Sequence, residues 1–150
     1  MKDVRKMKRF ICTIFLLLGI LLLSSCTSSN HFNYYSIREE ISKVEIIHVI
    51  SEWELEYEIL SELSENELEV FLEKLAEVHY TKSLFGDPGT LDDEKCIKIT
   101  YKSGDFDIIT SFLIVTFDAN SSKIQWESII MDKSIVLDKF NVLIDEFEND

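Results

Sequence analysis

The stretch KCIKITYKSGDFDIITSFLIVTF, residues 95–117, decides the fold class. Two runs within it, Lys95 to Tyr101 and Asp105 to Phe117, are rich in β-branched and aromatic residues and predict two strands. Lys102, Ser103 and Gly104 between them predict a short hairpin turn. Strands joined so closely run antiparallel, because parallel neighbours need a crossover of a dozen or more residues. The stretch therefore predicts an antiparallel sheet.

The second run carries large apolar residues at both alternating sets of positions. One set contains Ile108, Phe112 and Ile114, and the other contains Ile109, Leu113, Val115 and Phe117. A strand of this kind is either central and covered on both faces, or its second face meets a partner. An oligomer that forms through the strand Phe106 to Phe117 is thus one expectation.

Two further strands are expected upstream of this stretch. Ile41 to Ile50 is rich in β-branched residues, and Trp53 to Leu60 alternates apolar and acidic residues with a period of two. Ser51 and Glu52 would make a tight turn between them, although they lack the Gly or Asn that such turns prefer. The alternation places three glutamates on one face, namely Glu54, Glu56 and Glu58.

Two amphipathic helices complete the core elements. Ser64 and Glu67 fit a capping box at the start of a helix over 65–78. Ser134 can cap a second helix, whose apolar stripe is Val136, Phe140, Leu143, Ile144 and Phe147.

The remaining segments fill in the element order. Lys123 to Met131 predicts a strand, a short strand is expected near Tyr80 to Leu84, and FGDPGTLDDE, residues 85–94, predicts a loop. The order is ββα, βββ, α. The prediction is an α+β domain with an antiparallel sheet of five to six strands and two amphipathic helices packed on one face.

The first 25 residues have the pattern of a signal peptide. The chain begins MKDVRKMKRF, with five basic residues and one acid, and an apolar run from Phe10 to Leu23 follows. That run is shorter than the roughly 17 to 25 residues that a membrane-spanning helix needs. We therefore expect a signal peptide over 1–25 that is removed.

The residues that end this run, Leu23, Ser24, Ser25 and Cys26, resemble the lipobox of bacterial lipoprotein precursors. The resemblance implies a diacylglyceryl group on the Cys26 thiol and cleavage before that residue. Two acyl chains hold a protein stably on a membrane. The expected location is then the cell membrane, lipid-anchored on its extracytoplasmic face. An uncleaved anchor, or a signal peptide cut elsewhere, is the alternative.

In composition the chain is similar to small lipoproteins of low-GC Gram-positive bacteria, which implies no activity.

The expected mature chain is strongly acidic. Removing residues 1–25 leaves 10 basic and 27 acidic residues, a net charge of −17. Such a charge repels nucleic acid and favours basic partners such as a cationic peptide or protein face. We expect residues 26–36 to be a lipid-anchored tether and residues 37–150 to form a single acidic domain.

Candidate sites are few. Glu54, Glu56 and Glu58 form a row for a basic partner, or else a solvated strand face that discourages edge pairing. Asp87, Asp92, Asp93 and Glu94 crowd one loop, but their spacing is not that of an EF-hand calcium loop. The histidines His31, His48 and His79 have no zinc-site spacing, and Cys96 lies in a strand pattern typical of a buried thiol. No catalytic residue, metal or cofactor is predicted.

The expectation for function is a membrane-tethered, non-enzymatic binding or accessory module, with a cationic peptide or protein as its partner. Two alternatives stay open. One is a cell-envelope hydrolase that uses scattered carboxylates, because folding can bring two acids together. The other is a structural subunit of an oligomer.

Overall fold

The computed structural model describes residues 30–83, 89–131 and 134–148 of the chain. These residues form an eight-stranded sheet in the order β1-β4-β8-β7-β6-β5-β2-β3, and every neighbouring pair is antiparallel. The strands are β1 (Asn30–His31), β2 (Ile41–Ser51), β3 (Glu56–Glu62), β4 (His79–Lys82), β5 (Glu94–Tyr101), β6 (Phe106–Ile109), β7 (Leu113–Phe117) and β8 (Lys123–Ile130). The helices are the 3-10 helix η1 (Tyr34–Glu40) and the α-helices α2 (Glu65–Ala76) and α3 (Ser134–Glu148).

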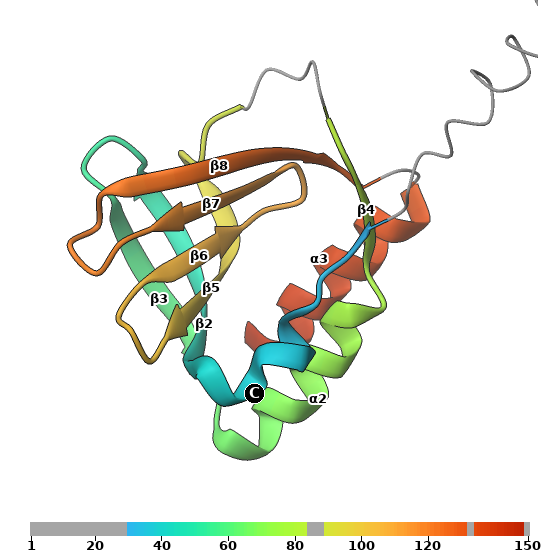
Figure 1. The fold of residues 1–150 in the computed structure, drawn as a ribbon. Coiled ribbons are helices and arrows are strands. Elements are labelled where there is room, and N and C mark those ends of the chain that lie inside the picture. The colour runs from blue at the N-terminus through green and yellow to red at the C-terminus, as the bar shows by residue number, and fades with distance from the viewer. Residues whose placement is uncertain (1–29, 84–88, 132–133, 149–150) are drawn as a thin grey trace, which may run out of the picture.

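The predicted fold class is wrong in its numbers of strands and helices. The sheet has eight strands rather than five to six, and η1 is a third helix in addition to the two expected. The curved sheet dominates the molecule, and α2 and α3 lie together on one side of it (Figure 1). Part of the difference comes from Asn30–His31, which pair with β4 although their sequence has no apolar period.

A second part of the difference is a turn inside the predicted strand from Asp105 to Phe117. Thr110 directly follows β6, and its Oγ1 accepts hydrogen bonds from the backbone N–H groups of Leu113 at 2.9 Å and Phe112 at 3.2 Å. The Thr110 N–H also donates to the Leu113 carbonyl at 2.8 Å. A threonine side chain thus closes this hairpin without Gly, Asn or Pro, so the sequence gives no turn signal.

The hairpin between β2 and β3 is also displaced from its predicted position. Residues 52–55 form the turn and β3 begins at Glu56, so the predicted strand Trp53 to Leu60 is confirmed only from Glu56 onward. Its predicted start and the two-residue turn are wrong. Leu55 lies in this turn with a φ of 49°, which is a left-handed backbone conformation that leucine rarely adopts. Nothing in the pattern WELEYEIL indicates that Leu55 leaves the strand.

Several predicted elements are confirmed. Helix α2 begins after Ser64, whose N–H donates to Glu67 Oε2 at 2.6 Å in the predicted capping box. The apolar stripe of α3 is buried at Phe140, Leu143, Ile144 and Phe147, while the side chain of Val136 lies outside the described residues. The strands β2, β4, β5 and β8 lie where the sequence indicated.

Two hydrophobic cores lie on opposite faces of the sheet. The first core packs α2 and α3 against the sheet and includes Ile46, Ile97 and Phe71. The second core lies on the other face and includes Ile47 and Cys96, which are the next cross-strand pair along β2 and β5. Successive residues of a strand point to opposite faces. Both alternating sets of positions in the central strands are apolar because each face of the sheet is covered by a core. The apolar residues of β6 and β7 are therefore buried within the chain itself, apart from Ile114, which is partly buried.

Residues 30–36, expected to be part of the tether, belong to the folded domain. Phe32 and Tyr34 are buried in the first core, and Asn30 and His31 pair with Tyr80 and His79 of β4. The fold therefore takes up part of the segment that the sequence assigned to the tether.

Candidate functional site

A pocket of about 690 Å³ lies where the turn between β2 and β3 meets the start of β8. Its walls come from three segments that are distant in the sequence. The lining residues are Glu52, Trp53, Glu54, Leu55, Thr90, Asp92, Phe117, Asn120, Ser121 and Lys123. We call this site the acidic pocket, because three carboxylates and one ammonium group line it.

Glu52 joins the walls of the acidic pocket. Its Oε1 accepts a hydrogen bond from Lys123 Nζ at 2.6 Å, and its Oε2 accepts bonds from the N–H of Leu91 at 2.9 Å and from Thr90 Oγ1 at 3.2 Å. The Glu52 N–H donates to Asp92 Oδ1. Partial burial acts to raise the pKa of Glu52, but the bonds from Lys123 and Leu91 outweigh it and lower that pKa. Ionised Glu52 thus links the turn between β2 and β3 to residues 90–92 and to Lys123.

Trp53 projects from the turn that Glu52 fixes. Its side chain is 95% exposed, which is unusual for the largest apolar side chain. A tryptophan held beside carboxylates can stack on an apolar group or on a cation. This residue gives the acidic pocket a contact that the glutamates do not provide.

The three predicted glutamates do not share one strand face. Glu54 lies in the turn and lines the acidic pocket, whereas Glu56 and Glu58 lie on the edge strand β3. All three are exposed and form no ion pair with any residue that the structure describes. Most described cations already have carboxylate partners, namely Arg38, Lys43, Lys74, Lys82, Lys95, Lys98 and Lys123. These glutamates therefore carry negative charge that no described cation compensates.

A buried ion pair lies on the second-core face of the sheet. Glu45 is fully buried, with Oε2 at 3.1 Å from Lys98 Nζ and Oε1 accepting a 2.7 Å hydrogen bond from Lys43. Lys98 also donates to the Tyr57 hydroxyl at 2.7 Å and lies 4.9 Å from the centre of the Phe106 ring. The two buried charges form an ion pair, but Glu45 Oε2 accepts no hydrogen bond from the residues that the structure describes. Their opposite charges stabilise each other inside the sheet, which is a structural role.

A second buried carboxylate joins three strands and η1. Asp107 accepts hydrogen bonds from the hydroxyl groups of Tyr34 at 2.8 Å, Tyr101 at 2.6 Å and Thr116 at 2.7 Å. Burial, followed by the negative charge of Asp107, raises the pKa of Tyr34 well above its usual range. Burial and the same carboxylate raise the pKa of Tyr101. The network fixes the N-terminal segment to the sheet.

The other candidates from the sequence have structural partners. Asp92 accepts a hydrogen bond from the Glu52 N–H, and Asp93 Oδ1 lies 2.9 Å from His48 Nε2. Asp87 lies outside the described residues. Within the described ranges, no group of three or more His, Cys, Asp and Glu side chains could hold a metal ion. Cys96 is buried as predicted, and burial raises the pKa of its thiol to about 12. A thiol of that pKa is a poor nucleophile.

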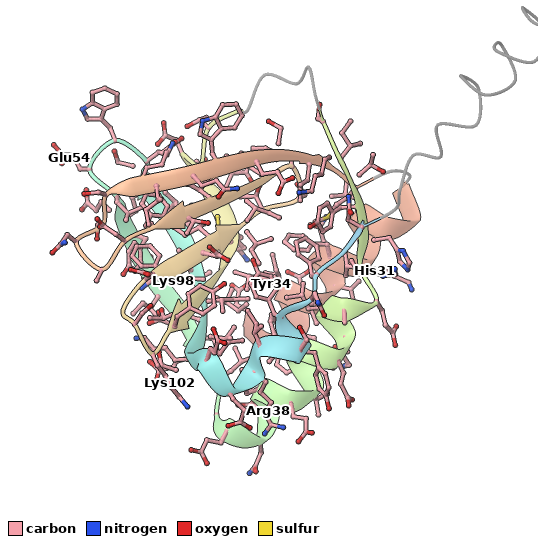
Figure 2. All side chains as sticks on the ribbon, viewed as in Figure 1. His31, Tyr34, Arg38, Glu54, Lys98 and Lys102 are labelled. Atoms are coloured by element: carbon pink, nitrogen blue, oxygen red, sulfur yellow. The ribbon has the colours of Figure 1, made fainter. Side chains whose placement is uncertain are left out.

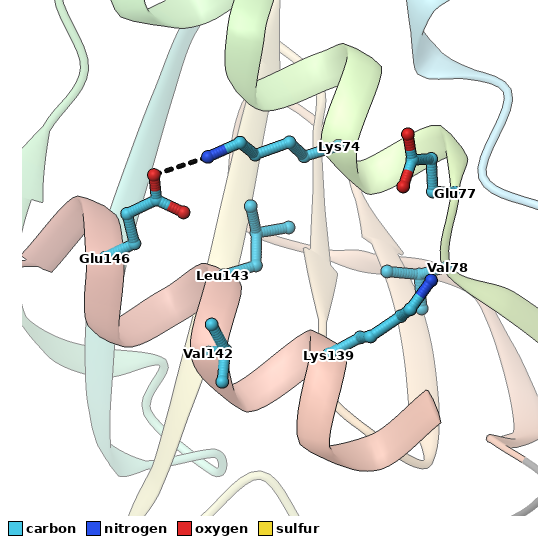
Figure 3. Close-up of a pocket in the computed structure, with 7 residues that line it drawn as sticks. All are labelled: Lys74, Glu77, Val78, Lys139, Val142, Leu143 and Glu146. Carbon is cyan, nitrogen blue, oxygen red and sulfur yellow. Dashed lines mark hydrogen bonds and ion pairs between the residues drawn. The ribbon is translucent and has the colours of Figure 1, made fainter. Parts of the chain in front are cut away.

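A smaller hollow of about 220 Å³ lies between α2 and α3 (Figure 3). Its floor is apolar, with Val78 and Leu143, and its rim consists of charged side chains, among them the ion pair of Lys74 with Glu146. No polar groups converge inside it, so it offers little specificity for a ligand.

The acidic pocket is therefore the described site best suited to binding. The sequence did not predict the convergence of Glu52, Asp92 and Lys123, because 71 residues separate Glu52 from Lys123. Cys26 lies outside the described residues. None of the described helices is long and apolar enough to cross a membrane. Comparisons with family models, with curated proteins and with solved structures give no match for this chain.

Proposed function

We propose that the protein is a lipid-anchored, extracytoplasmic binding module, and that the acidic pocket with the adjoining edge of β3 binds a cationic peptide or protein segment. The observation that carries this proposal is the exposed Trp53 beside Glu54 and Asp92, which form no ion pair with the described residues. An extended basic segment could place a lysine or arginine near Glu54 and an apolar or cationic group on the indole ring. The net charge of −17 would speed its association.

Chemistry at this site is not part of the proposal. Glu52 is the most constrained carboxylate of the pocket, and its pKa is lowered, whereas a general acid of a hydrolase needs a raised one. The pocket instead offers fixed negative charge and an aromatic surface, which suit recognition.

The anchor would place the acidic pocket away from the membrane. From Cys26 to Asn30 the chain has four residue steps, which span at most about 14 Å. A lipid on Cys26 would therefore keep the β1–β4 edge near the bilayer. His31 of that edge and Glu54 of the pocket lie on opposite sides of the molecule (Figure 2). The binding end would then face the extracellular space.

The binding proposal is tested with a triple variant and a matched control. Glu54→Gln, Glu56→Gln and Glu58→Gln remove three charges at the proposed site. Glu65→Gln, Glu73→Gln and Glu77→Gln remove three exposed charges from α2 and its C-cap. Titration with a lysine-rich decapeptide at about 0.15 M salt should show at least tenfold weaker binding for the first variant and nearly unchanged binding for the second. Equal losses in both would refute a localised site.

The anchor is tested separately by mass spectrometry of the membrane-bound protein. Cys26→Ser should abolish acylation and release the chain from the membrane. An unmodified Cys26 in the mature protein would refute the anchor and leave the peptide-binding proposal to its own test.

A further inference from the structure

We infer that His31 and His79 form a binding site for a divalent transition-metal ion on the β1–β4 edge, with Cu²⁺, Ni²⁺ or Zn²⁺ as the class of ligand. The two residues are 48 positions apart in the sequence, and no spacing signal connects them. The sheet makes them direct cross-strand partners, and their ring centres lie 4.0 Å apart. The inference is independent of the acidic pocket.

The backbone already supplies the arrangement that such a site needs. Cross-strand partners in an antiparallel pair place their Cβ atoms about 4.5–5.5 Å apart on the same face. Two imidazole nitrogens on one ion must lie about 3 Å apart, because each metal–nitrogen bond is about 2.0–2.1 Å long. Both side chains are exposed, so small rotations of the rings can bring one nitrogen of each to that separation.

The choice of metal follows from the ligand chemistry. Neutral imidazole suits Zn²⁺, Cu²⁺ and Ni²⁺, whereas Ca²⁺ and Mg²⁺ prefer oxygen ligands. An imidazole binds a metal through one nitrogen and keeps the other for a hydrogen bond, so another contact of either ring is compatible with binding. With two protein ligands, water or a second molecule fills the remaining positions. The negative charge of the protein raises the local concentration of any cation.

Binding would have a structural consequence. β1 consists of two residues at one edge of the sheet, and an ion held by His31 and His79 would cross-link it to β4. Asn30 and His31 would then be linked more firmly to the domain, at the edge nearest the proposed lipid anchor.

The experiment uses the full, untagged chain in detergent, with accessible thiols alkylated. Zn²⁺ and Ni²⁺ are titrated against the wild type and against His31→Asn, His79→Asn and His48→Asn. His48 is the matched control, because it lies on β2 beside Asp93. We expect one ion per chain, at least tenfold weaker binding in each of the first two variants, and unchanged binding in the third.

A second measurement does not depend on the variants. Substoichiometric Cu²⁺ should broaden the imidazole NMR signals of His31 and His79 before that of His48. The inference would be overturned if neither Zn²⁺ nor Ni²⁺ bound at millimolar concentration. It would also be overturned if His31→Asn and His79→Asn bound these ions as tightly as the wild type does. Equal broadening of all three histidines, or tight competition by Mg²⁺, would show general carboxylate binding and would also overturn it.

Discussion

The hydroxyl group of Tyr34 donates a 2.8 Å hydrogen bond to Oδ2 of Asp107, which lies 73 residues further along the chain. Both side chains are buried. The bond joins η1 to the centre of the sheet, so this helix is part of the folded core.

Tyr34→Phe should lower the free energy of unfolding by about 1.5–3 kcal/mol, because a hydrogen bond to a charged group is lost inside the protein. Tyr35→Phe is the matched control, because Tyr35 is exposed and has no hydroxyl partner in the described part of the chain. Urea denaturation measures both changes. A similar loss in the two variants would show that the Asp107 network does not stabilise the segment.

Stability should decline at alkaline pH because of the same network. The pKa values of Tyr34 and Tyr101 are raised by burial and by Asp107, so the folded state keeps protons that the unfolded state releases above about pH 10. Their contribution is complete below that pH and is lost as the pH rises. The Cys96 thiol, with a pKa of about 12, acts in the same direction. The double variant Tyr34→Phe, Tyr101→Phe should show a flatter decline in urea midpoints between pH 8 and 11. An unchanged slope would exclude the tyrosines as the cause.

Lys98→Met should destabilise the protein by about 3 kcal/mol, because it leaves the buried Glu45 with Lys43 as its only described cation partner. Adding Glu45→Leu to this variant should recover much of the loss, since neither buried charge of this pair then remains. Lys43→Met is the milder control, because its side chain is 38% exposed. Chemical denaturation of the wild type, Lys98→Met, Glu45→Leu and the double variant gives the coupling energy, and purely additive effects would contradict the interpretation.

Gly89→Ala should destabilise the domain by about 2 kcal/mol. Gly89 has a φ of +66°, and an added Cβ would lie 2.7 Å from Cε2 of Phe112. Adding Phe112→Leu should relieve the close contact but not the backbone strain. Thermal unfolding of the single and double variants separates these two costs, and a fully stable Gly89→Ala protein would show that neither operates.

Glu52→Gln should loosen the acidic pocket without unfolding the domain. The substitution weakens the bonds to Lys123 and Leu91, so hydrogen exchange at Leu91 and along residues 52–55 should accelerate. Glu54→Gln removes the same charge from a side chain that forms no ion pair with the described residues, and it should leave exchange unchanged. Hydrogen bonds lower the pKa of Glu52, so its bonds to Lys123 and Leu91 in the wild type should also weaken as the pH falls and this carboxyl group becomes protonated.

The predicted elements that proved right had signals carried by neighbouring residues. The capping box of Ser64 and Glu67 and the stripe from Phe140 to Phe147 each lie within a few turns of one helix. The turns that were missed depend on single side chains in unusual roles. Thr110 closes a hairpin through its hydroxyl group, and Leu55 adopts a left-handed conformation, and neither role has a composition signal.

The sequence by itself determined the antiparallel character of the sheet, the two amphipathic helices, the acidic charge and the resemblance of Leu23 to Cys26 to a lipobox. Those properties come from local patterns and from composition. Tertiary structure decided the number of strands, the second core and the partners of distant side chains. Glu52 meets Lys123, and His31 meets His79, only because strand order places them side by side. Pairing between distant strands depends on the packing of the whole sheet, so no local pattern of residues specifies it.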